Sequence, residues 1–269
     1  MSHVATAKQD WSADVEFCRM NSNSMPATFW LFWHMVRDRS LLARAIPEVN
    51  ACRTTSTNNG WSFDMTKLCN QPLLQSSYAE TLRLYVAVYI IRKPEYEDAQ
   101  VLDYRIPKDK MMVVSSAMAH MDKRNWNLGT LEEHPVERFW ADRFLTYGGN
   151  ISRSSPALAT AGAPSTSGTS ASTLSLPTVS KPLTPEPKFS LNGYSGAWIP
   201  FGGGIHQCPG RHWVKLQMLL SFAIISSAFD IELVPGKAKL KVDMAKYGLG
   251  ALNPAEKAGF RIRRKPTAA

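Results

Sequence analysis

The sequence contains few cysteines, and none of them lies close to another. Its 269 residues include four, Cys18, Cys52, Cys69 and Cys208, and no CxxC pair occurs. Zinc ribbons, dithiol redox sites and dense disulfide frameworks need cysteines at short spacings, so the sequence argues against these classes. Scattered, unpaired cysteines favour a reducing compartment.

Long hydrophobic runs are also missing. The two longest, at 25–35 and 219–229, are interrupted by His34 and by serines, and both are shorter than the roughly 20 residues of a spanning helix. The polar start, MSHVATAKQD, does not resemble a signal peptide. With 44% hydrophobic residues the chain can bury a core. Its net charge of +9 points towards acidic partners such as nucleic acid, an anionic membrane or an acidic protein, although many ordinary basic enzymes share such a charge.

The segment 151–188 has no aromatic residue and consists mainly of Ser, Thr, Pro, Ala and Gly. Such a composition buries too little apolar surface to offset the entropy of ordering, so we expect a disordered insertion. It separates an ordered part, 1–150, from an ordered tail, 189–269. Composition alone leaves open whether these are two domains or one interrupted domain.

The hydrophobic pattern predicts a mainly α fold with small β-sheets. Residues 12–46 are helical in character, with a kink expected at Pro26, and 68–85 predicts a second helix. Residues 86–120 alternate and are rich in β-branched and aromatic side chains, which predicts a small sheet. In the tail we expect a helix from Pro209 to about Ser227 and strands at 229–234 and 260–265.

The stretch FGGGIHQCPGRHW, residues 201–213, is the most distinctive part of the sequence. It could be a tight loop beside a core cysteine. A phosphate-binding loop lacks its Lys and Ser/Thr here, and a zinc site of His206, Cys208 and His212 lacks an evident fourth ligand.

The order F-x-x-G-x-x-x-C-x-G, formed by Phe201, Gly204, Cys208 and Gly210, resembles the cysteine loop of the cytochrome P450 family of haem-thiolate monooxygenases. Glycines let the backbone lie against a flat macrocycle, and the following Pro209 places the sulfur at a helix N-terminus, where a thiolate is favoured. The resemblance implies that Cys208 is the axial ligand of haem b iron. It also implies that Phe201 packs beside the sulfur and that Gly204 and Gly210 help to bind the cofactor.

Two further motifs occur in the family's order. Glu80 and Arg83 in SYAETLRLY lie three residues apart on one face of the predicted helix; alone, they would read as a solvated surface pair. HPVERFWADRF resembles the family's arginine stretch, with Ala141 where a proline is frequent. The resemblance implies a buried structural triad of Glu80, Arg83 and Arg143.

Further site residues follow only from the resemblance. Arg92 matches a propionate-binding arginine, although an exposed strand residue is the alternative, and His206 stands where the family usually has arginine. Asn23 and Ser24, in MNSNSMPATFW, occupy the catalytic segment of the family's central helix over the haem. This version is similar to many fungal members and to the steroid 7-alpha-hydroxylase and prostacyclin synthase branch. The alternative role is to ease the Pro26 kink.

The resemblance covers the C-terminal half of the P450 fold, as one domain interrupted by 151–188, so we expect a truncated product or an incomplete gene model. It implies a monooxygenase that oxidises an apolar lipid, sterol or secondary metabolite, with electrons from NADPH through a reductase and no nucleic acid partner. Arg211 and Lys215 are candidates for docking an acidic reductase.

The alternatives to this function are a peroxide isomerase that needs no reductase and a non-catalytic or incompletely folded haem-binding fragment. The family is usually found at the endoplasmic reticulum membrane, whereas the sequence as given predicts a cytoplasmic chain.

Overall fold

The computed structural model describes residues 12–55, 61–147, 186–234 and 240–266. The helices are α1 (Ser12–Arg37), α2 (Arg39–Ala51), α3 (Met65–Leu68), α4 (Pro72–Tyr85), α5 (Ser116–Met121) and α6 (Arg211–Ala228). The strands are β1 (Arg53–Thr55), β2 (Trp61–Phe63), β3 (Val86–Arg92), β4 (Ala99–Val101), β5 (Tyr104–Ile106), β6 (Met112–Ser115), β7 (Leu145–Tyr147), β8 (Pro187–Phe189), β9 (Phe229–Leu233), β10 (Leu249–Ala251) and β11 (Phe260–Arg264). The predicted class, mainly α with small sheets, is confirmed.

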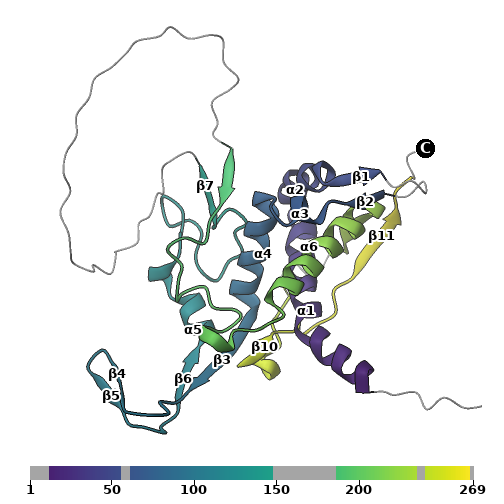
Figure 1. Cartoon of the computed structure of the whole chain (residues 1–269). Coiled ribbons are helices and arrows are strands. Elements are labelled where there is room, and N and C mark those ends of the chain that lie inside the picture. The colour runs from purple at the N-terminus through teal and green to yellow at the C-terminus, as the bar shows by residue number, and fades with distance from the viewer. Residues whose placement is uncertain (1–11, 56–60, 148–185, 235–239, 267–269) are drawn as a thin grey trace, which may run out of the picture.

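Three helices form the centre of the molecule. α1 and α6 pack against each other, and both contact α4 (Figure 1). Leu31 of α1, Leu74 of α4 and Phe222 of α6 are fully buried in one core cluster, which also includes Ala197. Residues from both sides of the gap at 148–185 therefore share one core.

The stretch 12–46, expected to be helical, forms two helices. α1 continues through Pro26 and ends at Arg37. The carboxylate of Asp38 then accepts hydrogen bonds from the backbone N–H groups of Ser40 (2.9 Å) and Leu41 (3.1 Å). An aspartate that satisfies the free donors of a first turn starts a new helix, so α2 begins there.

The sheets are small and antiparallel, apart from one isolated parallel bridge. β3 is the centre of a three-stranded sheet in the order β10-β3-β6, and the β4–β5 hairpin projects from the body (Figure 1). The expectation that the β segment extends to His120 is wrong, because residues 116–121 form α5. The hydroxyl of Ser115 accepts from the backbone N–H of Met118 at 3.5 Å, and the helix formers Ala and Met follow.

Most of the expected insertion at 151–188, namely residues 151–185, lies outside the described residues. Its last residues do not fit that expectation, because Pro187 and Lys188 belong to β8, which pairs with β7. The backbone hydrogen bonds of this antiparallel pair anchor the chain on the C-terminal side of the gap. In the described ranges, none of the helices combines the length and the apolar content that crossing a membrane requires.

Candidate cofactor cleft around Cys208

The glycine-rich loop before α6 has a backbone that only glycine adopts easily. Gly202 and Gly204 have φ angles of +76° and +69°, in the left-handed region. Two turns define the loop: Gly202 N–H donates to the carbonyl of Ile199 (3.2 Å), and Gln207 N–H donates to that of Gly204 (3.2 Å). A Cβ at Gly203 or Gly204 would meet nothing within 4 Å. The loop thus offers bare backbone next to open space.

Cys208 follows this loop and is exposed. Its backbone N–H donates to the carbonyl of Phe201 at 2.9 Å, and its own carbonyl accepts from the guanidinium of Arg211 at 3.0 Å. Gly210 is the N-cap of α6, and because glycine has no side chain, the first turn is not capped by one. A Cβ on Gly210 would lie 3.6 Å from the Cys208 sulfur. The backbone around the thiol is therefore held in place while the sulfur stays accessible beside the first turn of α6.

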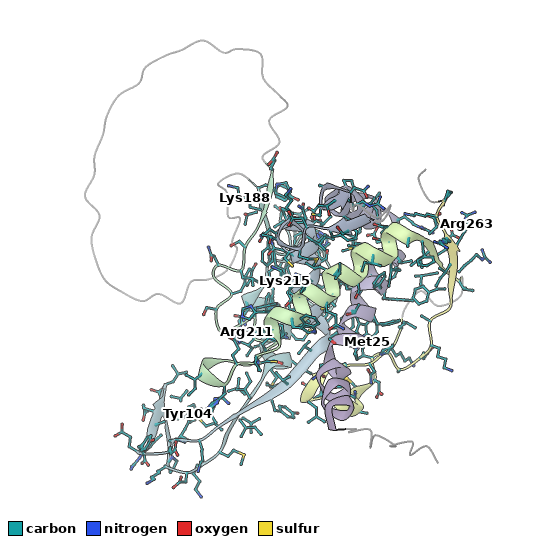
Figure 2. All side chains as sticks on the ribbon, turned by 45° about the vertical axis from the view of Figure 1, so that its right-hand side comes forward. Met25, Tyr104, Lys188, Arg211, Lys215 and Arg263 are labelled. Carbon is teal, nitrogen blue, oxygen red and sulfur yellow. The ribbon has the colours of Figure 1, made fainter. Side chains whose placement is uncertain are left out.

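The sulfur lies at a cleft with a volume of about 580 Å³. Pockets for small molecules and cofactors usually measure about 300–1,000 Å³. α1, the end of α4, β3, the loop at 200–210, the start of α6 and β10 all contribute to its walls. Of the site residues expected from the sequence, the following line it: Asn23, Ser24, Arg92, Phe201, His206, Cys208 and Gly210. Figure 2 labels Met25 on α1 and Arg211 at the start of α6, which follow the cleft residues Ser24 and Gly210 in the sequence. Gly204 shapes the loop but does not line the cleft.

Arg92 connects β3 to the glycine loop. Its guanidinium donates to the carbonyl of Gly203 at 2.8 Å and to that of its neighbour Ile91 at 2.7 Å. Guanidinium has five N–H donors, so these two bonds leave donors for an anionic group in the cleft. His206 is exposed at the same cleft. The cleft therefore has one fixed cation and one residue that becomes cationic when protonated.

Asn23 connects α1 to β10. Its side-chain carbonyl accepts the backbone N–H of Ala251 at 3.1 Å. A Cβ on Gly250 would lie 2.1 Å from the same oxygen, so only glycine allows this approach. The neighbouring Ser24 is buried, and its backbone carbonyl accepts from the hydroxyl of Thr28 at 2.8 Å. Asn23 thus positions one wall of the cleft in addition to facing it.

Glu80, Arg83 and Arg143 lie together away from the cleft, with side chains that are 0% exposed. The Glu80 carboxylate accepts from Arg83 Nε (2.7 Å) and Nη2 (2.9 Å) and from Arg143 Nε (3.0 Å). It also accepts the backbone N–H of Trp140 at 3.1 Å. The reading as a solvated surface pair is therefore wrong, because the tertiary fold covers this face of α4.

Other donors of both arginines bind backbone carbonyls. Arg83 donates to His120 (2.7 Å) and Val136 (2.6 Å). Arg143 donates to four carbonyls of the segment 127–138: Asn127, His134 (3.2 Å), Pro135 (3.1 Å) and Arg138 (3.1 Å). Burial lowers the pKa of Arg143, and Glu80 acts in the opposite direction. Buried charges are tolerated when they are paired and hydrogen-bonded, as these two guanidiniums are.

Comparison with known proteins identifies the fold family. The family model described as Cytochrome P450 matches residues 22–159 and 181–260, which is more than half of the chain. The chain belongs to the cytochrome P450 family. The crystal structure of a cytochrome P450 (CYP102L1) matches with a TM-score of 0.59 and 19% identity, over 90% of this chain and 42% of that one. That likeness concerns the fold alone.

Two curated fungal relatives are 37% identical to this P450 chain. They are the cytochrome P450 monooxygenase efuG of Hormonema carpetanum, over 251 residues, and the cytochrome P450 monooxygenase fsoE of Humicola fuscoatra, over 252 residues. The cholesterol 7-alpha-monooxygenase of Cricetulus griseus is 26% identical over 256 residues. Each match covers 91% of this chain. The chain spans 41%, 40% and 43% of the length of these relatives.

The residues of the cleft fit the haem group that the family implies. The exposed thiol of Cys208 is a donor for iron, and the bare loop backbone leaves room for a flat ring. None of the described residues lining the cleft is a carboxylate, whereas Arg92 and His206 can face an anionic edge. The zinc alternative is not supported: among the described residues, no group of three His, Cys, Asp or Glu side chains could hold a metal ion.

Two expected reductase contacts are not free surface cations. The Lys215 ammonium donates to Gln75 Oε1 at 2.6 Å and is half-buried, and burial lowers its pKa. Arg211 is half-buried and donates to the Cys208 carbonyl. Both are tied to the protein around α6, so their charge is less available to a partner than the sequence alone suggested.

Trp213, Gly250 and Ala251 are among the cleft-lining residues that the sequence did not predict. Trp213 lies in the first turns of α6 and is 58% exposed. Gly250 and Ala251 belong to β10, which pairs with β3 far away in the sequence. The alternation of Gly248 and Gly250 was the available signal, since it marks close backbone approach in a strand.

Proposed function

We propose that this P450 chain binds haem b with Cys208 as the axial iron ligand. We further propose that it is the thiolate-side part of a monooxygenase that oxidises an apolar small molecule, such as a lipid, sterol or secondary metabolite. The observation that carries the proposal is the single cleft at which Cys208, Arg92, His206 and the residues of α1 meet. Because the chain spans about two fifths of its curated relatives, activity, substrate and partners are all part of the proposal.

The loop and β3 would hold the cofactor. The hydrogen bond from Cys208 N–H to Phe201 and the turn at Gly202 hold the backbone of Cys208, a residue that lines the cleft. Phe201 packs edge-on against Trp198, with ring centroids 6.1 Å apart, and shields one side of the loop. We assign the propionates to Arg92 and His206, because charge-assisted hydrogen bonds to carboxylates are the strongest that such side chains make.

A haem with a cysteine thiolate ligand supplies dioxygen activation, in which electron donation from sulfur favours O–O cleavage. On the α1 side, we propose that Asn23 and Ser24 orient water and a polar ligand. The Asn23 amide can donate while its carbonyl accepts from Ala251. A serine hydroxyl can both donate and accept, which suits it to relay a proton.

The cleft is lined by apolar side chains, which suit both the porphyrin ring and an apolar substrate lying against it. Ala27 of α1, Leu82 and Val86 near the end of α4, and Val214 of α6 line it. The relative in Cricetulus griseus is named for cholesterol, which is one member of this chemical class. We propose a NADPH-dependent reductase as the electron donor and no nucleic acid partner.

A second candidate is a peroxide isomerase that takes no electrons from outside. The observation in its favour is that none of the described residues lining the cleft is an acid. Monooxygenation needs protons delivered to oxygen, whereas rearranging a bound peroxide consumes none. Asn23 and Ser24 can hold a peroxide by hydrogen bonds without a net proton supply.

Reconstitution tests the proposal. The full chain is loaded with haem and reduced under carbon monoxide, and the Soret band is recorded for wild type and for Cys208→Ala. We expect a strongly red-shifted thiolate band in wild type that the variant loses. If the chain takes up no haem, the proposal is overturned, and the alternative of a non-catalytic fragment is favoured instead.

The loaded chain then distinguishes the two reactions. Substrate-dependent NADPH consumption with a reductase supports the monooxygenase. Turnover of an organic peroxide without NADPH or reductase, combined with no NADPH consumption, supports the isomerase.

A further inference from the structure

His120 lies between the Glu80 network and the chain that leads into the Cys208 loop. It is in the last turn of α5 and is fully buried. Its ring lies edge-on to Trp126, with centroids 6.3 Å apart, and the Arg83 guanidinium lies 5.3 Å from the centre of the same indole. This histidine has no part in the cleft lining described above.

His120 has one hydrogen bond to the Glu80 network and one to the chain that leads into the Cys208 loop. Its backbone carbonyl accepts from Arg83 Nη1 at 2.7 Å, which connects it to the carboxylate of Glu80. Its ring nitrogen Nε2 accepts the backbone N–H of Ile199 at 3.2 Å. The histidine therefore joins the charged core of the fold to Ile199, the residue just before the loop at 200–210.

The contact at Ile199 continues to the backbone of Cys208 through two backbone hydrogen bonds. The carbonyl of Ile199 accepts from Gly202, and the carbonyl of Phe201 accepts from Cys208 at 2.9 Å. Fixing Ile199 therefore restricts the turn that sets the position of Phe201, and Phe201 in turn fixes the backbone of Cys208. In the described residues this is a continuous path from Glu80 to Cys208.

The acceptor role requires a neutral ring. A protonated histidine has N–H groups at both ring nitrogens and cannot accept from Ile199. Burial, together with the charge of Arg83, lowers the pKa of His120 to about 4, although the backbone carbonyls of Val86 and Arg83 act against this. With Nε2 as the acceptor, the proton must be on Nδ1, which makes no hydrogen bond of normal geometry.

We propose that His120 is a positioning residue for the Cys208 loop: neutral Nε2 accepts the Ile199 N–H and thereby couples the Glu80–Arg83–Arg143 framework to the geometry of the thiol. The part of this inference that concerns iron ligation rests on the proposed function. The part that concerns the loop does not, because it can be measured without haem.

The main variant is His120→Phe, which keeps a ring against Trp126 and removes the acceptor. His120→Gln is the rescue, because its side-chain oxygen reaches about as far as Nε2. His34→Phe is the matched control: His34 is also buried, with a pKa lowered to about 3, but it bonds Tyr85 at 2.8 Å and has no link to the loop. Amide hydrogen exchange of the full chain without haem is measured over peptides that cover 199–208.

We expect His120→Phe to speed exchange at 199–208 at least about tenfold, corresponding to about 1.4 kcal/mol of lost protection, and His120→Gln to restore most of the difference. His34→Phe should leave this segment at the wild-type rate relative to the rest of the chain. Wild-type exchange in His120→Phe, or an equal increase in His34→Phe, would overturn the proposal. If His120→Phe does not fold, nitrogen-15 NMR of the wild-type histidine decides: an Nδ1–H tautomer supports the proposal and an Nε2–H tautomer overturns it.

The haem-loaded chain gives a second readout. We expect His120→Phe to lower the fraction of the reduced carbon monoxide complex that has the thiolate Soret band, with recovery in His120→Gln. A wild-type chain without that band contradicts the proposed function, while the exchange data still judge the role of His120. An unchanged thiolate fraction in His120→Phe, beside a normal wild type, contradicts the coupling alone.

Discussion

Two regions of this P450 chain are built from polar and charged residues in opposite ways. Around Glu80, three charged side chains are 0% exposed, and the arginines donate to both the carboxylate and nearby carbonyls. Around Cys208, the thiol and His206 are exposed, and glycines take the place of side chains. The first region uses its hydrogen-bonding groups on the protein itself, whereas the second leaves them available to a ligand.

This difference separates stability from binding. Removing a charge from a closed network leaves its partners buried and uncompensated, which is expensive. Altering an exposed loop changes few contacts in the protein, so the cost appears mainly when a ligand is bound. The two regions should therefore respond differently to the same kinds of substitution.

The largest effect is expected for Glu80→Gln. This change keeps the shape of the side chain but leaves the guanidiniums of Arg83 and Arg143 buried without a counter-charge, at a cost of about 3–5 kcal/mol. Urea denaturation at pH 7 measures the free energy of unfolding. Glu232→Gln is the control, because its 3.2 Å pair with Arg39 is exposed and should cost at most about 1 kcal/mol. Equal losses in the two variants would show that the Glu80 network is not special.

Acidification should weaken the buried framework. The pKa values of His34 and His120 are lowered to about 3 and about 4, mainly by burial. In the unfolded chain both titrate near 6.5, so between pH 6.5 and 4 the unfolded state binds more protons and the free energy of unfolding falls as pH falls. From pH 7 to pH 5 each histidine accounts for a loss of about 2 kcal/mol.

Denaturation curves at the two pH values check this expectation. His34→Phe removes one of the two groups, so its loss between pH 7 and pH 5 should be about 2 kcal/mol smaller than that of wild type. An identical pH dependence in wild type and variant would mean that His34 is protonated equally in both states.

A smaller effect is expected for Gly202→Ala in the loop. The φ of +76° costs an alanine about 1–2 kcal/mol, although its Cβ would only touch Ile90 at 3.9 Å. Gly203→Ala is the matched control, since its φ of −154° suits any residue and its Cβ would meet nothing; it should cost about 0.5 kcal/mol or less. Equal stabilities of the two variants would show that the left-handed turn does not constrain the loop.

The local features of both regions could be predicted from the sequence. The three-residue spacing of Glu80 and Arg83 placed them on one helix face, and the order of Phe201, Gly204 and Cys208 pointed to the loop before α6. The burial of Glu80 could not be predicted from spacing, because other segments of the chain cover that face of α4.

Contacts between distant segments account for the rest. Asn23 meets Ala251 across 228 residues, and His120 meets Ile199 across 79. Such pairs leave no periodic trace in the sequence, since each depends on how α1, α5 and β10 pack rather than on its neighbours. The start of α5 at Ser116 was missed for a related reason: the side-chain cap at Ser115 ended the alternating pattern of the strand.

The smallest effect on folding should come from Cys208→Ala, because the thiol is exposed. We expect a change of about 0.5 kcal/mol or less in the free energy of unfolding of the chain without haem. Urea denaturation at pH 7 measures it. A loss comparable with that of Glu80→Gln would mean that the sulfur belongs to the framework.

The most direct test of the account is the Soret spectrum of the haem-loaded, reduced chain under carbon monoxide, recorded for wild type and Cys208→Ala. We predict a strongly red-shifted thiolate band in wild type and its loss in a variant that still folds. A wild-type chain that takes up no haem, or a thiolate band that persists in Cys208→Ala, would contradict it.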